Sequence, residues 1–106
     1  MSTFAVLAEP HRRQILDLLR GGGRSVGELV DALPLTQPTV SKHLRLLKEA
    51  GLVRVQPQAR RRVYSLDPRP LREVDAWLEP YRQAWSDRLD ALEAHLDSQF
   101  DSLEEQ

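Results

Sequence analysis

Hydrophobic residues recur at helical spacing near the start of the chain. This spacing predicts a short apolar helix over residues 3–8 and a second helix that begins at Pro10, where a proline is tolerated in the first turn. The second helix carries Ile15, Leu16, Leu18 and Leu19 on its buried side. It is predicted to end at the glycine run 21–23, because three glycines lose too much backbone entropy to remain helical.

Two further helices are predicted, separated only by a short turn. Ser25 and Glu28 have the spacing of a capping box, which opens a third helix that Pro34 ends. Thr36 can cap the fourth helix, which extends to about Ala50. Two helices joined in this way form a helix-turn-helix pattern, in which the second helix can lie in a DNA major groove.

After residue 51 the hydrophobic period changes from that of a helix to two. Alternating apolar residues predict one strand near 52–55 and another near 63–66, with a connecting turn at 57–59. The predicted fold class is therefore mainly α with a small β-hairpin, followed by a long C-terminal helix.

The last third of the chain carries one apolar stripe with a mean spacing of about 3.56 residues, between a coiled coil and a straight helix. Pro80 is predicted to kink this helix or to end a shorter segment near Glu79. A stripe this long exceeds what a 66-residue domain can cover, so part of it is predicted to pack on the same helix of a second copy. The stripe consists of Leu71, Val74, Leu78, Tyr81, Trp85, Leu89, Leu92, Leu96, Phe100 and Leu103.

The fourth predicted helix separates its apolar and polar positions. Val40, Leu44 and Leu47 fall on one side. A hydroxyl, an amide and three cations occupy the exposed arc, which is predicted to contain no acid, and these groups can pair with base edges and phosphates. The arc consists of Gln37, Pro38, Ser41, Lys42, Arg45 and Lys48.

The charge balance of the whole chain conceals a segregation. The 106 residues hold 15 Lys and Arg against 16 Asp and Glu, a net charge of −1 that by itself argues against nucleic acid as a partner. Residues 1–66, however, hold 11 basic and 5 acidic side chains, and residues 67–106 hold 4 and 11. The first region therefore carries a net charge of +6 and the second a net charge of −7. This separation predicts that one face of the molecule binds an anion and that the other is kept away from it.

The segments Ser41–Val53, Arg60–Leu66 and Leu7–Leu16 closely resemble the ArsR-type winged helix-turn-helix repressors, over about the first two thirds of the chain. The resemblance implies that Gln37, Pro38, Thr39, Ser41 and Lys42 lie in or beside the major groove, with Arg45 near its phosphates. It also implies that Arg60, Arg61 and Arg62 act as the wing, and that the first and last helices form a homodimer interface.

Two departures from that family concern metal sensing and the wing. Val30 and Asp31 stand where many members have metal-binding thiolates, and the chain has no cysteine. Near the C-terminus, His95 is the only histidine among several aspartates, too few imidazoles for an ordinary zinc site. No metal ligand, cofactor or effector is therefore assigned. Ala59 occupies the wing turn, where a glycine is common in the family.

Catalysis is not predicted. His43 falls between Val40 and Leu47 on the helical wheel, which favours a packed or hydrogen-bonded structural role. His11 and His95 have no histidine near them in sequence, and a solvated or lightly paired role is preferred for both. Ser41 lacks a base and an orienting acid at recognisable spacing. The longest apolar run, residues 4–8, is far shorter than a membrane span, so a cytoplasmic location and no membrane partner are expected.

The sequence thus predicts a winged helix-turn-helix DNA-binding region over residues 1–66 and an amphipathic dimerisation helix over 67–106, within one compact domain. The predicted function is a homodimeric transcriptional repressor that binds an inverted repeat in double-stranded DNA, with autoregulation as an extension. A metal- or ligand-responsive sensor and a helical protein-interaction module remain alternatives. The residues assigned to the dimer interface are Phe4, Leu7, Leu78, Tyr81, Trp85, Leu89, Leu92 and Leu96.

Overall fold

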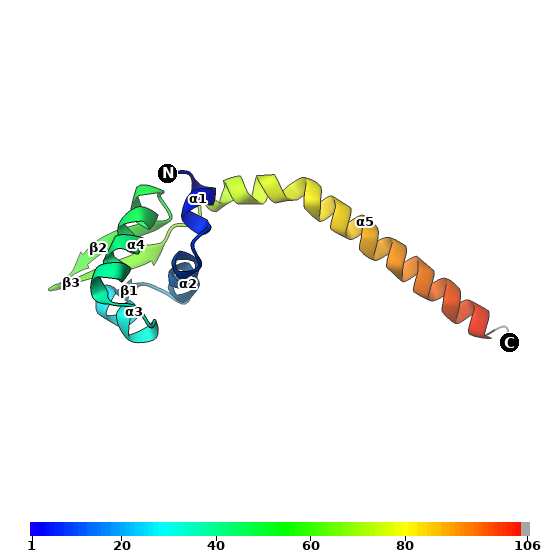
Figure 1. Ribbon diagram of the computed structural model, residues 1–106, viewed down its shortest axis with the longest axis horizontal. Coiled ribbons are helices and arrows are strands. Elements are labelled where there is room, and N and C mark those ends of the chain that lie inside the picture. The colour runs from blue at the N-terminus through cyan, green and yellow to red at the C-terminus, as the bar shows by residue number, and fades with distance from the viewer. Residues whose placement is uncertain (105–106) are drawn as a thin grey trace. The chain divides into compact units, whose positions relative to one another are not determined.

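The computed structural model describes residues 1–104 of the chain and is mainly helical with one small sheet (Figure 1). It divides into a first compact unit, Met1–Val74, and a second that begins at Asp75 and consists of the remainder of the last helix. In chain order the elements are α1 (Thr3–Leu7), α2 (Pro10–Leu19), β1 (Arg24–Ser25), α3 (Val26–Ala32), α4 (Gln37–Glu49), β2 (Val53–Gln58), β3 (Arg61–Leu66) and α5 (Leu71–Glu104).

The predicted starts of the first four helices are confirmed, with one difference in how they are capped, whereas the last helix begins at Leu71 and not at residue 67. Ser25 Oγ accepts from the Glu28 amide at 3.2 Å, and the Glu28 carboxylate accepts from the Ser25 amide at 3.1 Å, which completes the capping box of α3. Thr36 is the N-cap residue of α4, but its hydroxyl pairs with the Thr39 hydroxyl at 2.9 Å and caps no backbone amide. The predicted side-chain cap at Thr36 is therefore wrong.

The sheet has three antiparallel strands in the order β1-β3-β2, so the sequence missed one strand. β1 is only two residues long and pairs Arg24 with Tyr64 and Ser25 with Val63. Such a short segment has no period of its own, and only its pairing with β3 makes it a strand. The β2–β3 turn also lies later than predicted, at residues 59 and 60, because the ladder continues to the Gln58–Arg61 pair.

The core lies within the first unit, where helices and the sheet bury their apolar faces together. α4 contributes the face predicted from its wheel, and Leu52 and Val53 add the start of the sheet. Packing of α2 and α3 against α4 fixes the position of the second helix of the helix-turn-helix. The buried hydrophobic residues are Val6, Ile15, Leu16, Leu19, Leu29, Val40, Leu44, Leu47, Leu52 and Val53.

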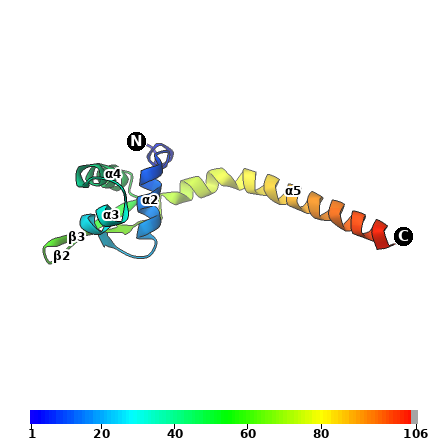
Figure 2. The ribbon, with the colours of Figure 1, turned by 60° about the horizontal axis from the view of Figure 1, so that its bottom comes forward.

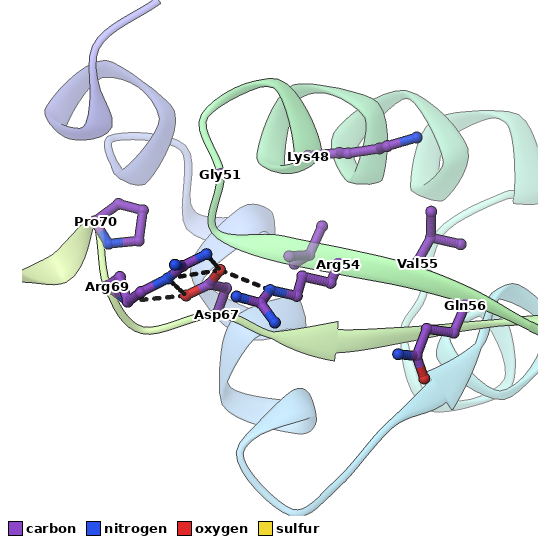
Figure 3. A pocket seen from close by; sticks show the side chains of 9 residues that line it. Lys48, Gly51, Arg54, Val55, Gln56, Asp67, Arg69 and Pro70 are labelled. Carbon is purple, nitrogen blue, oxygen red and sulfur yellow. Dashed lines mark hydrogen bonds and ion pairs between the residues drawn. The ribbon is translucent and has the colours of Figure 1, made fainter.

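A buried aspartate closes the end of the sheet (Figure 3). The Asp67 amide donates to the Leu52 carbonyl at 2.8 Å, and the Asp67 side chain is only 6% exposed. Its carboxylate accepts from the Arg69 guanidinium at 2.7 Å and from Arg54 at 2.9 Å. These hydrogen bonds, those of Arg69 first, hold the pKa of Asp67 well below its usual range although burial opposes them.

The last helix, α5, is continuous through Pro80, which excludes the second of the two alternatives for this proline, that a shorter segment ends near Glu79. The Arg82 guanidinium braces the turn around the proline. It donates to the Asp75 carbonyl at 2.9 Å and to the carboxylates of Asp75 and Glu79. These bonds hold together the turn that proline weakens by removing one helical hydrogen bond. Within residues 1–104, no helix is long and apolar enough to cross a membrane.

Candidate nucleic-acid interface

The outward face of α4 carries the side chains predicted to meet DNA. Gln37, Pro38, Ser41, Lys42 and Arg45 are exposed, and Thr39 is half-buried. Within residues 1–104, no hydrogen bond or ion pair engages the side chains of Lys42, Arg45 and Lys48, so their charges are available to an anion. Opposite them, Val40, Leu44 and Leu47 are fully buried and hold the helix in place.

The prediction that this arc contains no acid is wrong at its C-terminal end. Glu49 is exposed and follows Lys42 by seven residues, which returns it to nearly the same side of the helix. About 10 Å of helix axis separates the two residues, because each residue adds about 1.5 Å. The acid-free surface is therefore the stretch 37–48, and Glu49 marks its end.

The three consecutive arginines lie at the tip of the β2–β3 hairpin, which projects beyond the helices of the first unit in Figure 2. Arg60 lies in the turn, and Arg61 and Arg62 begin β3, all three exposed. Arg61 forms an ion pair with Glu28 of α3. Arg60 and Arg62 have no such partner within the described part of the chain, so their charges are the more available of the three.

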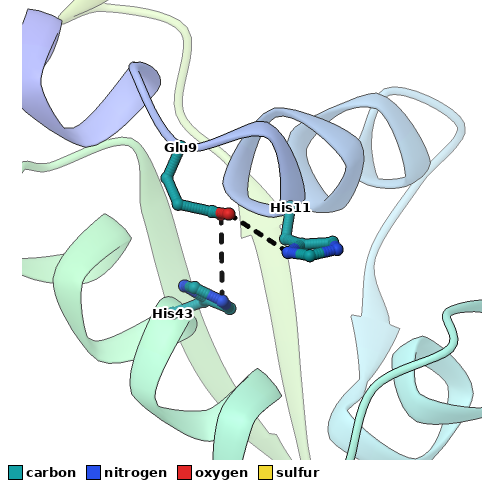
Figure 4. A group of neighbouring side chains, drawn as sticks. All are labelled: Glu9, His11 and His43. Carbon is teal, nitrogen blue, oxygen red and sulfur yellow. Dashed lines mark hydrogen bonds and ion pairs between the residues drawn. The ribbon is translucent and has the colours of Figure 1, made fainter.

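A second group of polar side chains connects α2 with α4 (Figure 4). The carboxylate of Glu9, which caps α2, lies 3.1 Å from His11 Nδ1 and 3.8 Å from His43 Nε2. Arg12 Nη1 lies 3.4 Å from His43 Nδ1, and Arg12 Nε donates to the Val6 carbonyl at 2.6 Å. The side chain of His43 is 12% exposed, in agreement with the packed, hydrogen-bonded role that its wheel position predicts.

The electrostatics of this group follow from its partial burial. Burial lowers the pKa of His43, and the opposing attraction of Glu9 only partly offsets it. For Glu9, burial acts to raise the pKa, but the amide of Arg12 and the two imidazoles outweigh it and lower the pKa below its ordinary value. At neutral pH, Glu9 is therefore an ionised carboxylate that lies beside a neutral His43.

The residues assigned to a dimer interface divide between the two units. In the first unit, Phe4 is exposed and Leu7 is half-buried against the core. In the second unit, Leu78 is half-buried, and the other stripe residues leave 44% to 67% of their surface exposed. These exposed stripe residues are Tyr81, Trp85, Leu89, Leu92, Leu96, Phe100 and Leu103. Trp77, which is not part of the stripe, is exposed on the same helix.

Comparisons with known proteins agree with this architecture. Residues 7–56 match the family described as a helix-turn-helix domain. The chain is 40% identical to the HTH-type transcriptional regulator Rv2034 of Mycobacterium tuberculosis, across 92% of this chain and 89% of that protein. It is 31% identical to the transcriptional repressor SdpR of Bacillus subtilis, across 73% of this chain and 86% of the repressor.

A solved structure gives the same fold. The homodimeric winged helix-turn-helix DNA-binding domain of Mb0332 from Mycobacterium bovis, described as a possible ArsR-family transcriptional regulator, matches with a TM-score of 0.60 and 30% identity. The match covers 74% of this chain and 73% of that one. The fold and the exposed basic face of α4 define the class of this protein, a winged helix-turn-helix protein that binds DNA. The chain belongs to the ArsR-type family of transcriptional regulators, as its sequence resemblance indicated.

Sequence reasoning missed two contacts of this surface. It treated Arg61 as a free cation, but the fold brings it to Glu28, 33 residues earlier. It also found no histidine near His11 in the sequence, although the fold brings the ring of His43 to a centroid distance of 6.1 Å from that of His11. The inward position of His43 on its helical wheel was the available signal, and no local pattern indicated that the start of α2 would face it.

Proposed function

We propose that this regulator is a homodimeric repressor that binds an inverted-repeat operator with α4 and contacts phosphates with the β2–β3 turn. The observation that carries the proposal is the exposed stretch 37–48 of α4, whose cations have no partner within residues 1–104. Ser41 and Lys42 supply the hydroxyl and amino groups that pair with base edges, and Arg45 supplies a phosphate contact. Binding, and not catalysis, is the activity of this surface.

The exposed apolar stripe of α5 supports the homodimer. Eight large apolar side chains face solvent along one helix, and each gains roughly 1.5–3 kcal/mol when it is fully buried. Mb0332, which shares the fold, is described as homodimeric. A two-fold dimer presents two copies of α4 to two half-sites, which is why an inverted repeat is the expected operator.

Footprinting on the DNA upstream of the protein's own coding sequence tests the operator and the extension to autoregulation. Protection of two symmetric half-sites about one helical turn apart is the expected result. Protection of a single half-site, or the absence of sequence-specific protection, would contradict the proposal that a dimer binds two half-sites in this DNA.

Substitutions on α4 and in the turn should separate base contacts from phosphate contacts. Lys42→Ala and Ser41→Ala should relax sequence preference, by roughly 1–3 kcal/mol of discrimination at the contacted base pair. Arg60→Ala should weaken binding to all sequences alike and lower the salt slope by about one. Fluorescence anisotropy against operator and scrambled duplexes at several salt concentrations measures both.

Arg61→Ala and Arg20→Ala complete that series. Arg61→Ala should lower DNA affinity less than Arg60→Ala, because a phosphate contact at Arg61 has to replace its ion pair with Glu28. Arg20, exposed at the end of α2, lies outside α4 and the hairpin, so Arg20→Ala should leave the salt slope unchanged. Uniform losses from all these variants would contradict the division of roles.

A further inference from the structure

Three side chains with metal-ligating atoms converge between α2 and α4. Glu9 caps α2, His11 lies in its first turn, and His43 lies in the middle of α4. One carboxylate oxygen and one nitrogen from each ring lie within 4.8 Å of one another. Figure 4 shows the carboxylate between the two imidazoles.

We propose that Glu9, His11 and His43 bind a divalent transition-metal ion, with Zn²⁺ as the reference ion, and that the bound ion cross-links the start of α2 to α4. Two imidazole nitrogens and one carboxylate oxygen are the donors that zinc, nickel and cobalt accept, whereas Mg²⁺ and Ca²⁺ prefer oxygen donors throughout. Three protein ligands leave one position of a tetrahedral zinc ion to water. This inference does not depend on the proposed operator or on the dimer.

The three side chains become more exposed in the order His43, Glu9, His11. The side chain of His43 is 12% exposed, that of Glu9 30% and that of His11 41%. An ion therefore reaches the group from the side of His11, where the water ligand also has room. His43 is held by packing, which fixes one ligand on the helix that carries Lys42 and Arg45.

The distances specify which side chain has to move. Ligand atoms on one tetrahedral zinc ion lie roughly 3.3 Å apart, because each bond to zinc is about 2.0–2.1 Å long. Glu9 and His11 already meet this spacing at 3.1 Å. His43 Nε2 lies 3.8 Å from Oε2 of Glu9, and because packing holds His43 in place, metal binding has to draw the Glu9 carboxylate toward it.

Arg12 limits the affinity of the site and changes its contacts when the ion binds. A metal on His43 Nε2 leaves the ring proton on Nδ1, so the 3.4 Å approach of Arg12 Nη1 to Nδ1 has to lengthen. Arg12 keeps its bond to the Val6 carbonyl, which holds its positive charge near the ion. The expected affinity is accordingly micromolar and below that of a thiolate site.

Calorimetric titration of the untagged full chain with Zn²⁺ tests the site without DNA. The titration is carried out at pH 7.5, because metal binding competes with protons for the ligand atoms. One ion per chain is expected, together with a rise in Tm, because a ligand bound only by the folded state stabilises it. Titration with Co²⁺ should give the visible absorption of a low-coordinate site.

Two ligand variants and one matched histidine variant assign the ion to its residues. His11→Gln and Glu9→Gln should each weaken Zn²⁺ binding at least about tenfold and abolish the rise in Tm. Gln at position 9 retains an oxygen that accepts from the Arg12 amide, so the cap of α2 is kept. His95→Gln removes the remaining histidine, whose described hydrogen bond joins it to Gln99 on α5, and should leave binding unchanged.

The NMR chemical shifts of the histidine ring nitrogens distinguish metal ligation from a structural role of the same side chains, because only direct ligation changes them on addition of Zn²⁺. Zn²⁺ should shift His11 Nδ1 and His43 Nε2 while the His95 ring stays constant. The proposal is overturned if wild-type chain binds no Zn²⁺ at micromolar concentration, if His11→Gln binds like wild type, or if His95→Gln loses the ion. Loss of DNA binding by the metal-free chain would instead count against the proposed operator-binding function alone.

Discussion

At the scale of single residues, Asp67 is the charged side chain that the first unit buries, and its environment makes stability depend on pH. Its carboxylate accepts from Arg69 and Arg54, and its pKa is lowered in the folded state. A group with a lowered folded pKa contributes its full stability above its ordinary pKa, about 4 for aspartate. This contribution is lost as the pH falls below that value.

Asp67→Asn should therefore lower Tm at neutral pH, because an amide cannot replace the charged acceptor of two guanidinium groups. The difference in Tm from wild type should narrow as the pH is lowered from about 5 toward 3. Thermal unfolding followed by circular dichroism measures both effects. Asp31→Asn, at an exposed site on α3, is the control and should leave Tm unchanged. A constant difference across this pH range would contradict the assigned charge effect.

At the scale of elements, the β2–β3 turn contains a strained residue. Ala59 has a φ of 55°, a left-handed conformation that costs an L-residue roughly 1–2 kcal/mol. A glycine is common at this position in the ArsR-type family, and a glycine would adopt this left-handed conformation without the steric cost. Gly51, which ends the α4 segment, has a φ of 77° and satisfies the same requirement.

Ala59→Gly should consequently raise the free energy of unfolding, by up to about 1 kcal/mol once the added freedom of the unfolded chain is subtracted. Gly51→Ala should lower it by about 1 kcal/mol for the opposite reason. A Cβ at position 51 meets only Pro70 at 3.5 Å, an ordinary contact, so the cost there is conformational. Urea denaturation of both variants measures the pair, and two changes of the same sign would contradict this account.

At the scale of the whole molecule, the apolar stripe of α5 determines the predicted assembly. Leu92→Glu places a charge in the middle of the stripe on both protomers. It should raise the dimer dissociation constant at least about 100-fold, because two leucines lose their burial. Analytical ultracentrifugation at micromolar concentration should then show a monomer, with weaker binding to the inverted repeat.

Ala91→Glu is the matched control for that substitution. It introduces the same charge one residue away, on the side of α5 that faces away from the stripe, and should leave the dimer intact. A Leu92→Glu chain that still sediments as a dimer would show that the copies associate through another surface.

The sequence by itself determined the features that depend on near neighbours in the chain. The capping box at Ser25, the division of α4 into an apolar and a polar side, and the apolar stripe of α5 rest on short spacings, and backbone geometry links such spacings directly to structure. The sequence left a kink or an end of the helix open at Pro80, and the structure has a continuous α5 there, with the Arg82 guanidinium bonded to Asp75.

Only the tertiary structure decided which distant residues meet. β1 is too short to show a period and exists through its pairing with β3. The Arg61–Glu28 pair and the Glu9, His11 and His43 group join residues about 30 positions apart, and their contacts depend on how α2, α3 and the hairpin pack around α4. Packing of a shared core sets those positions, and no local spacing encodes them.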